Sequence, residues 1–196
     1  VADVVRDSNG RISQLANYKR ISPKGSANTC GWFHPKNPNV VIFGSTIINP
    51  TESTPPGYDR GSGRYRWMFP PEMNIVRVEL DKADGSAKSL EVLVGNDEHY
   101  IAECAISPDG RYIVYCSLES NRGDLYIYDM ETKRKTNIVS AEGYDGGPFF
   151  APDGKRICYR SDRAGNHLLQ LYVADLAFNQ RGEVIGVQRE YQLTDN

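Results

Sequence analysis

Short runs in which apolar and polar residues alternate recur along the whole chain, and turn-forming residues separate them. Val, Ile, Tyr and Thr are frequent in these runs, and such residues fit the half-buried surface of a sheet. One run with its turn, AISPDGRYIVY at residues 105–115, returns as FFAPDGKRICY at residues 149–159. The pattern predicts an all-β protein built from repeats.

The spacing of the repeats indicates the architecture. Pro108 and Pro152 lie 44 residues apart, which matches the roughly 40 to 45 residues of a four-stranded propeller blade. Each copy continues into a second matching element, DLYIYD at residues 124–129 and QLYVAD at residues 170–175. The Asp-Gly pair in each copy suits a tight hairpin, because Gly accepts positive φ and Asp bonds nearby amides. We therefore expect a β-propeller of four-stranded antiparallel blades.

A third copy of the repeat is degenerate. It begins with WFHP at residues 32–35 and lacks the Asp-Gly turn, and its later strand comes only at residues 74–78. The delay is caused by residues 47–71, which are rich in Pro, Gly, Arg and Tyr. We interpret this segment as a long loop, and not as another strand pair, inserted into the blade.

The two ends of the chain resemble each other, because residues 1–22 return as residues 173–194 at a constant offset of 172. This echo predicts that the chain opens with the outer two strands of a blade. We expect one partial propeller domain over 1–196, with these outer strands at 1–22 and blades at 23–97, 98–140 and 141–196. That makes about three and a half blades, whereas closed propellers have about 4 to 8. We expect the other blades to come from the same longer chain or from another subunit, since open edges aggregate.

Composition excludes some functions. The net charge is −2 with both signs interspersed, which argues against nucleic acid as a partner. No apolar stretch approaches the roughly 18 residues of a transmembrane segment. The cysteines Cys30, Cys104, Cys116 and Cys158 form no CxxC pair, and buried free thiols are the favoured interpretation, with a disulfide left open. The histidines have no metal-ligand spacing, and hydrolase and nucleotide motifs are absent, so we predict no metal, no cofactor and no catalytic residue.

The motifs SPDGR at residues 107–111, APDGK at 151–155 and YDGGPFF at 144–150 resemble the TolB-like propeller repeats of bacterial exported proteins. The resemblance covers about residues 30–175. It implies a six-bladed propeller of the periplasm or cell envelope that presents a channel mouth to protein partners. Similar repeats also occur fused to peptidases and in some polysaccharide lyases, so the fold alone does not decide the function.

Candidate binding residues gather on one predicted face. The loops that enter the inner strands, the insertion and the other loops between second and third strands share this face, and the Pro-Asp-Gly turns lie opposite. Planar cations and aromatic rings interleave in the insertion, a composition enriched at interfaces. The candidates are Tyr58, Arg60, Arg64, Tyr65, Arg66 and Trp67 in the insertion and His99, Tyr100, Tyr144 and Asp145 in the entry loops. The alternative is structural: the insertion caps its own propeller with Trp67 and Met68 buried, and Asp145 caps a backbone amide.

The leading functional hypothesis is a non-enzymatic recognition or scaffold propeller of the bacterial cell envelope that binds a protein or an envelope polymer. The main alternative is the propeller part of an enzyme, which gates a peptidase or holds a sugar-acid lyase site near His99. A third hypothesis is a purely structural ring subunit.

Overall fold

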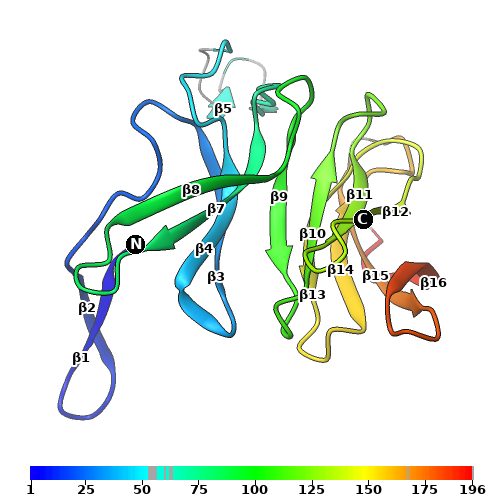
Figure 1. Ribbon diagram of the computed structural model, residues 1–196. Helices are drawn as coiled ribbons and strands as arrows, with labels where there is room; N and C mark the ends of the chain where they lie inside the picture. The colour runs from blue at the N-terminus through cyan, green and yellow to red at the C-terminus, as the bar shows by residue number, and fades with distance from the viewer. Residues whose placement is uncertain (53–56, 60, 62–63, 167, 196) are drawn as a thin grey trace.

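The computed structural model describes residues 1–52, 57–59, 61, 64–166 and 168–195, and it gives no side-chain description for 57–59 and 64–66. In this described part, all helices and strands assigned along the chain are β-strands, β1 to β16. They form three four-stranded antiparallel sheets and two two-stranded ones. Figure 1 shows the four-stranded sheets side by side, as propeller blades stand. The predicted all-β propeller fold is confirmed.

The three blades share one strand order, from an inner strand next to the propeller axis to an outer strand. The first blade is β3 (Asn28–His34), β4 (Asn37–Ser45), β7 (Asn74–Leu80) and β8 (Ala87–Val94). The second blade is β9 (Ile101–Ile106), β10 (Tyr112–Ser117), β11 (Asp124–Asp129) and β12 (Lys135–Val139). The third blade is β13 (Asp145–Phe150), β14 (Arg156–Ser161), β15 (Gln170–Phe178) and β16 (Val184–Gln192).

The Pro-Asp-Gly turns join the inner strand to the next strand, as the sequence predicts. In the second blade the amide of Gly110 donates to the Ser107 carbonyl at 2.8 Å, and in the third blade Gly154 donates to Ala151 at 2.9 Å. Gly110 has φ +77° and Gly154 has φ +68°. Positive φ is the conformation that Gly adopts without steric cost, so both turns depend on it.

The core lies between the blades. One apolar cluster joins the first and second blades, with Ile42 and Tyr115 among its members, and a second joins the second and third blades, with Leu125 and Tyr159 among them. Every residue of β9 and β10 is buried. The second blade is covered on both faces, which explains why its strands lack the usual alternation of buried and exposed residues.

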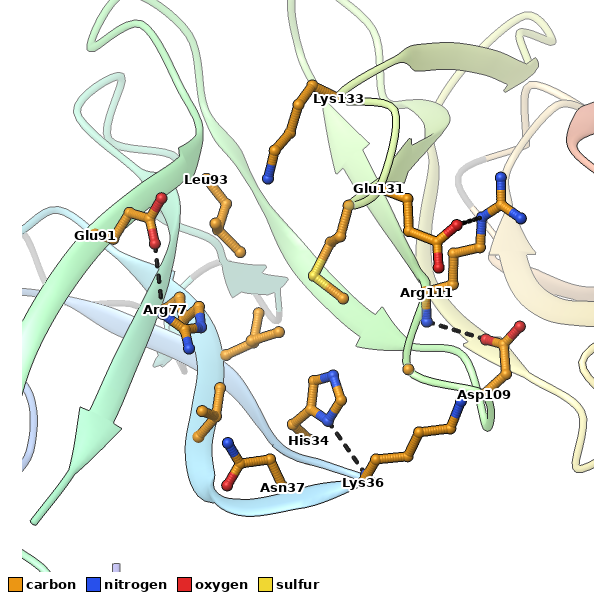
Figure 2. Close-up of a pocket in the computed structure, with 14 residues that line it drawn as sticks. His34, Lys36, Asn37, Arg77, Glu91, Leu93, Asp109, Arg111, Glu131 and Lys133 are labelled. Carbon is orange, nitrogen blue, oxygen red and sulfur yellow. Dashed lines mark hydrogen bonds and ion pairs between the residues drawn. The ribbon is translucent and has the colours of Figure 1, made fainter.

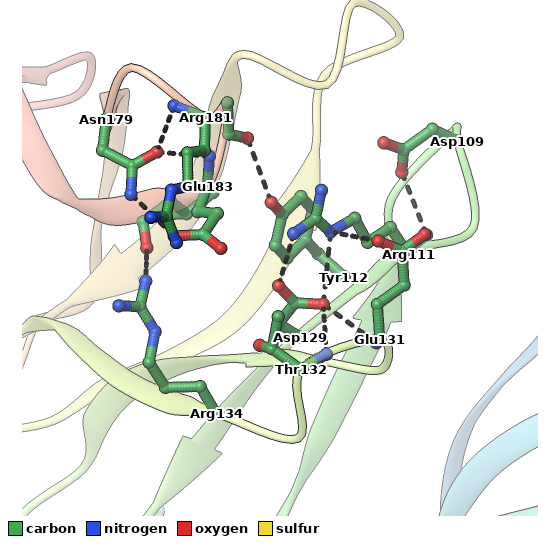
Figure 3. Close-up of polar contacts among 12 residues, drawn as sticks. Asp109, Arg111, Tyr112, Asp129, Glu131, Thr132, Arg134, Asn179, Arg181 and Glu183 are labelled. Carbon is green, nitrogen blue, oxygen red and sulfur yellow. Dashed lines mark hydrogen bonds and ion pairs between the residues drawn. The ribbon is translucent and has the colours of Figure 1, made fainter.

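Polar contacts also link the second blade to the third (Figure 3). The Tyr112 hydroxyl donates to the Gly182 carbonyl at 3.1 Å, and the Arg134 guanidinium donates to the Val184 carbonyl at 2.8 Å. Gly182 lies in the turn between β15 and β16, and Val184 is the first residue of β16. These bonds satisfy carbonyls at the outer part of the third blade, and they fix how the two blades lie against each other.

An ion pair stabilises the end of the second blade that carries the Pro-Asp-Gly turn. Arg111 contacts both carboxylate oxygens of Asp129, at 2.7 and 3.2 Å. Burial alone would raise the pKa of Asp129, but the hydrogen bonds from Arg111, Glu131 and Thr132 lower it to about 2. Asp129 is therefore ionised in the folded protein throughout the physiological range.

The inserted segment differs from the expectation of a loop without strands. It contains a small hairpin of β5 (Gly57–Asp59) and β6 (Arg64–Arg66), in which Tyr58 pairs with Tyr65. The prediction was wrong because three-residue strands are too short to produce a recognisable alternation, and the Pro and Gly residues around them read as loop.

The chain opens with a separate hairpin of β1 (Asp3–Arg6) and β2 (Ile12–Ala16). Figure 1 shows it beside the first blade, at the opposite end of the array from the third blade. Lys19, just after β2, forms a 3.3 Å ion pair with Asp84 in the turn between β7 and β8. Among the described residues, no helix is long and apolar enough to span a membrane.

Candidate functional site

The loops opposite the Pro-Asp-Gly turns form what we call the upper face, on which the insertion lies (Figure 1). Backbone hydrogen bonds hold these loops together. The amide of Leu118 donates to the Tyr100 carbonyl at 3.0 Å, and Asp162 donates to the Tyr144 carbonyl at 3.1 Å. Asp145 donates to the Gly123 carbonyl at 2.8 Å, which joins the second blade to the third. The entry loops thus lie beside the loops that follow the second strands, as predicted from the strand order.

A cavity of about 550 Å³ opens beside the axis, and we call it the upper cavity. Its walls come from the end of the insertion, from the inner strands of all three blades, and from β14 and β15. Five of the lining residues are aromatic, and two are charged. The aromatic members are Trp67, Phe69, Tyr100, Phe149 and Tyr159, and the charged members are Glu103 and Arg160.

Glu103 lies in a bulge of β9 and has φ +53°, a left-handed conformation that is costly for a residue with a side chain. Gly147 occupies the same repeat position in the third blade with φ +58°. Glu103 is 7% exposed, and its carboxylate accepts hydrogen bonds from the Tyr144 hydroxyl at 2.7 Å, the Gly147 amide at 2.5 Å and Arg160 at 3.1 Å. These three donors compensate the burial of the charge and hold the strained residue in place.

Arg160 connects this buried carboxylate to the cavity wall. Its guanidinium lies 5.4 Å from the centroid of the Trp67 ring, in cation–π geometry. Burial disfavours its charged form, but the charge of Glu103 raises the pKa of Arg160 overall. Arg160 Nε is buried without a hydrogen-bond partner among the residues that the structure describes. The cavity therefore offers a fixed cation beside an indole ring that is 48% exposed.

Tyr100 lines the wall near the insertion, and Tyr144 lies behind it. Phe69 packs edge-on against Tyr100 with centroids 5.0 Å apart, and it also contacts Tyr144 at 6.2 Å. Burial, more than any neighbouring charge, raises the pKa of both tyrosines. Both phenols stay protonated, so Tyr144 acts as a hydrogen-bond donor to Glu103.

The structure brings three of the predicted residues to this cavity. Trp67 and Tyr100 line it, and Tyr144 contacts it through Glu103 and Phe69. Asp145 is fully buried, where it accepts hydrogen bonds from Arg163 and the Ala141 amide, each at 3.2 Å. Burial is the main cause of the raised pKa of Asp145.

The other predicted residues lie elsewhere. His99 is half-buried beside the amide of Asn96, with 3.3 Å between Asn96 Nδ2 and His99 Nδ1. The remaining candidates belong to the insertion. Tyr58, Arg64, Tyr65 and Arg66 are on the β5–β6 hairpin, where only the backbone is described, and Arg60 lies outside the described residues.

Sequence reasoning missed Glu103 and Arg160. The repeat alignment contained a signal for both, because Glu103 stands where the next blade has Gly147, and Arg160 stands where the second blade has Cys116. A charged residue at a repeat position that is small or apolar in another blade marks a local change of environment.

A second hollow, of about 640 Å³, lies near the Pro-Asp-Gly turns between the first and second blades (Figure 2). Its floor is apolar, with Ile42 and Met130, and its rim carries charges of both signs. Among these, Arg77 pairs with Glu91 at 3.5 Å and Arg111 with Glu131 at 3.2 Å. Exposed pairs of this kind contribute little free energy, and donors do not converge on one point, so we regard this groove as the seam between two blades.

Within the described part of the chain, no group of three His, Cys, Asp or Glu residues could hold a metal ion. The four cysteines are free thiols, of which Cys104 and Cys116 are buried and Cys30 is exposed. Burial raises the pKa of Cys104 to about 12, so this thiol is unreactive at neutral pH.

Comparison with known proteins gives one family and several relatives. The family model described as "TolB beta propeller domain" matches residues 72–188. Over 99 residues the chain is 30% identical to the Tol-Pal system protein TolB of Francisella tularensis subsp. holarctica. This match covers 50% of this chain and 23% of that protein. Over 96 residues it is 40% identical to dipeptidyl-peptidase 5 of Porphyromonas gingivalis, which covers 43% of this chain and 14% of that one. The matched region is thus a minor part of each relative.

Among solved structures, the crystal structure of TolB from Acinetobacter baumannii superimposes with a TM-score of 0.57. The match covers 94% of this chain and 36% of that chain at 16% sequence identity. At this level of identity the superposition supports the propeller fold alone.

Proposed function

Because the chain belongs to the TolB β-propeller family, whose model matches residues 72–188, we propose that it is a non-enzymatic recognition module of the bacterial cell envelope. In this proposal the upper cavity binds a peptide segment of a partner protein. The Tol-Pal name of the Francisella relative supports an exported protein that works with protein partners. The blades at 23–97, 98–140 and 141–196, with the outer strands at 1–22, then form part of a ring of about six blades.

The observation that carries the proposal is the pairing of Trp67 with Arg160 at the cavity wall. A half-exposed indole and a fixed guanidinium are the side chains that most often dominate protein interfaces. Glu103 holds Arg160 by one hydrogen bond of 3.1 Å, which leaves other guanidinium donors for a ligand. A segment with a carboxylate next to an apolar side chain fits this chemistry.

A random peptide library displayed on phage tests the proposal. Peptides selected on the chain are expected to combine an acidic residue or a free carboxyl end with an apolar residue. Trp67→Ala should weaken their binding by about tenfold or more, because a half-exposed indole offers a large apolar contact area next to Arg160. Ile48→Ala, at a residue 59% exposed on the upper face and outside the cavity lining, is the matched control. Equal binding to the chain and to Trp67→Ala would contradict the proposal.

A second candidate function is supported by the 40% identity to dipeptidyl-peptidase 5. In that case the blades are the propeller part of a peptidase and the upper face meets the catalytic part. An assay of the full-length gene product for release of dipeptides from a synthetic peptide separates the two functions. Turnover would favour the peptidase, and its absence together with peptide binding would favour recognition.

A further inference from the structure

Each inner strand carries a bulge at the same repeat position. The residue at this position is Cys30 in the first blade, Glu103 in the second and Gly147 in the third. Glu103 and Gly147 both have positive φ, +53° and +58°. Gly adopts this conformation without steric cost, whereas Glu does not. Strained residues of this kind cluster at ligand-binding and switch sites, so Glu103 needs a functional explanation.

The bulges of the second and third blades are both shaped around Arg160. A Cβ atom at Gly147 would lie 3.3 Å from Arg160 Nε and 3.4 Å from Arg160 Cζ, so a side chain there would press on the guanidinium. Glu103 supplies the opposite charge, because its Oε2 accepts a hydrogen bond from Arg160 Nη2 at 3.1 Å. The third blade thus gives the guanidinium room, and the second blade holds it.

The other donors to Glu103 also come from the third blade. The Tyr144 hydroxyl donates to Oε1 at 2.7 Å, and the Gly147 amide donates to Oε2 at 2.5 Å. All these groups belong to two neighbouring blades that the structure describes, so their contacts do not depend on what covers the faces at the two ends of the array. Since both carboxylate oxygens already accept hydrogen bonds, Glu103 acts on a ligand mainly through its charge and through Arg160.

The two charges of the upper cavity balance each other. Among the described residues, Glu103 and Arg160 are the charged members of its lining, and their side chains are 9% and 32% exposed. A ligand carboxylate is attracted by the guanidinium and repelled by Glu103. One carboxylate can still bind, because Glu103 engages Nη2 and leaves Nη1 of Arg160 for a ligand. A second carboxylate meets the repulsion without a further cation to offset it.

We propose that Glu103 determines the specificity of the upper cavity: it positions Arg160 and restricts the ligand to one that presents a single carboxylate beside an apolar side chain. This role rests on the proposed function, because it concerns the same cavity and the same peptide ligands. Glu103 is a positioning residue, since it acts through Arg160 and through its own charge. Without that charge the cavity would carry a net positive charge and would favour ligands with more carboxylates.

Three versions of one peptide from the phage library test this role. The first has one acidic residue and an amidated C-terminus, the second has the corresponding amide in place of the acid, and the third keeps the acid and has a free C-terminal carboxyl. Isothermal titration calorimetry measures their dissociation constants. The unmodified chain should bind the version with one carboxylate about tenfold more tightly than the neutral version, and the second carboxylate should give no further gain.

Glu103→Gln removes the charge and keeps a side chain of the same size. This variant should bind the version with two carboxylates at least about fivefold more tightly than the version with one, because the charge of Arg160 is no longer balanced. Glu119→Gln is the matched control, since it removes the same charge from an exposed residue after β10 that does not line the cavity. Tyr144→Phe removes a hydrogen bond from Glu103 but leaves its charge. Both should keep the preference of the unmodified chain, whereas a merely structural Glu103 would make Tyr144→Phe resemble Glu103→Gln.

The outcomes separate this role from the proposed function. If the peptides bind but Glu103→Gln shows the same preference as the unmodified chain, the role of Glu103 is overturned and peptide recognition stands. Tighter binding of the version with two carboxylates by the unmodified chain would also overturn it, and that result needs no variant to fold. Failure of every version to bind the unmodified chain would overturn the proposed function and the role of Glu103 together. Circular dichroism confirms that each variant is folded.

Discussion

The second and third blades share a repeat, yet they differ in burial. All twelve residues of β9 and β10 are buried in the second blade, whereas β13 and β14 in the third blade contain exposed and half-buried positions. The second blade has a neighbour on each side, and the third has one described neighbour. A side chain at the same repeat position can therefore contribute much or little to stability, depending on how many blades pack against it. Matched substitutions at equivalent positions of the two blades measure this difference.

The largest difference is expected at the repeat position of Leu125 and Leu171. Leu125 is 0% exposed and Leu171 is 44% exposed. Leu125→Ala should lower the free energy of unfolding by about 2–5 kcal/mol, because it leaves a cavity in the core. Leu171→Ala should lower it by about 0.5 kcal/mol. Urea unfolding measures both losses. Similar losses would show that the two blades do not differ as described.

The ion pair of Arg111 with Asp129 gives a second, smaller contrast. In the third blade, the repeat counterpart of Arg111 is Lys155, which is exposed. Arg111→Met should lower the free energy of unfolding by about 2 kcal/mol, since the buried carboxylate of Asp129 loses its charged partner and keeps only the amides of Glu131 and Thr132. Lys155→Met should change it by less than about 0.5 kcal/mol. Chemical unfolding at neutral pH provides the measurement.

The same ion pair predicts a dependence on pH. The pKa of Asp129 is about 2 in the folded protein, below the roughly 3.9 of an unfolded chain. The stability from this carboxylate is therefore fully present above about pH 4 and is lost as the pH falls towards 2. Arg111→Met should lose less stability over that interval than the unmodified chain. A parallel decline in both proteins would exclude Arg111 as the cause of the lowered pKa.

The smallest contrast concerns the turn glycines. A Cβ atom at Gly110 would lie 2.7 Å from His34 Cε1, whereas at Gly154 the nearest atom, Pro108 Cδ, would be 3.6 Å away. Both positions have positive φ, so an alanine costs about 1 kcal/mol at each. Gly110→Ala should cost about 1 kcal/mol more because of the contact with His34. Thermal unfolding of both variants resolves the difference, and equal midpoints would contradict it.

The sequence predicted most of the fold, because the 44-residue spacing of the repeat indicates the blade length and its recurring turn residues indicate the hairpins. The Pro-Asp-Gly motif located two hairpins, and the 172-residue echo predicted a strand pair at 1–22, where β1 and β2 lie. The β5–β6 hairpin could not be predicted, since two strands of three residues carry no periodicity. Whether the chain is one domain with the boundaries expected stays a prediction.

The site was less predictable than the fold. Trp67 and Tyr100 were named from composition and strand order, and they do line the upper cavity. Glu103 and Arg160 meet only because a bulge in β9 turns Glu103 towards β14, and alternation along a strand does not reveal a bulge. Asp145 was a candidate from an entry loop, but it is buried, because Arg163 comes from the next loop and covers it.

The hydrogen bonds that Tyr112 and Arg134 give to the third blade end on carbonyl oxygens. Every residue supplies such an oxygen whatever its side chain, so the accepting strand can change its sequence without losing the bond. Only the donating blade is constrained. Tolerance to substitution should therefore differ between the two sides of this contact. The second blade must keep the donating side chains, whereas the third blade can change the residues whose carbonyls accept the bonds.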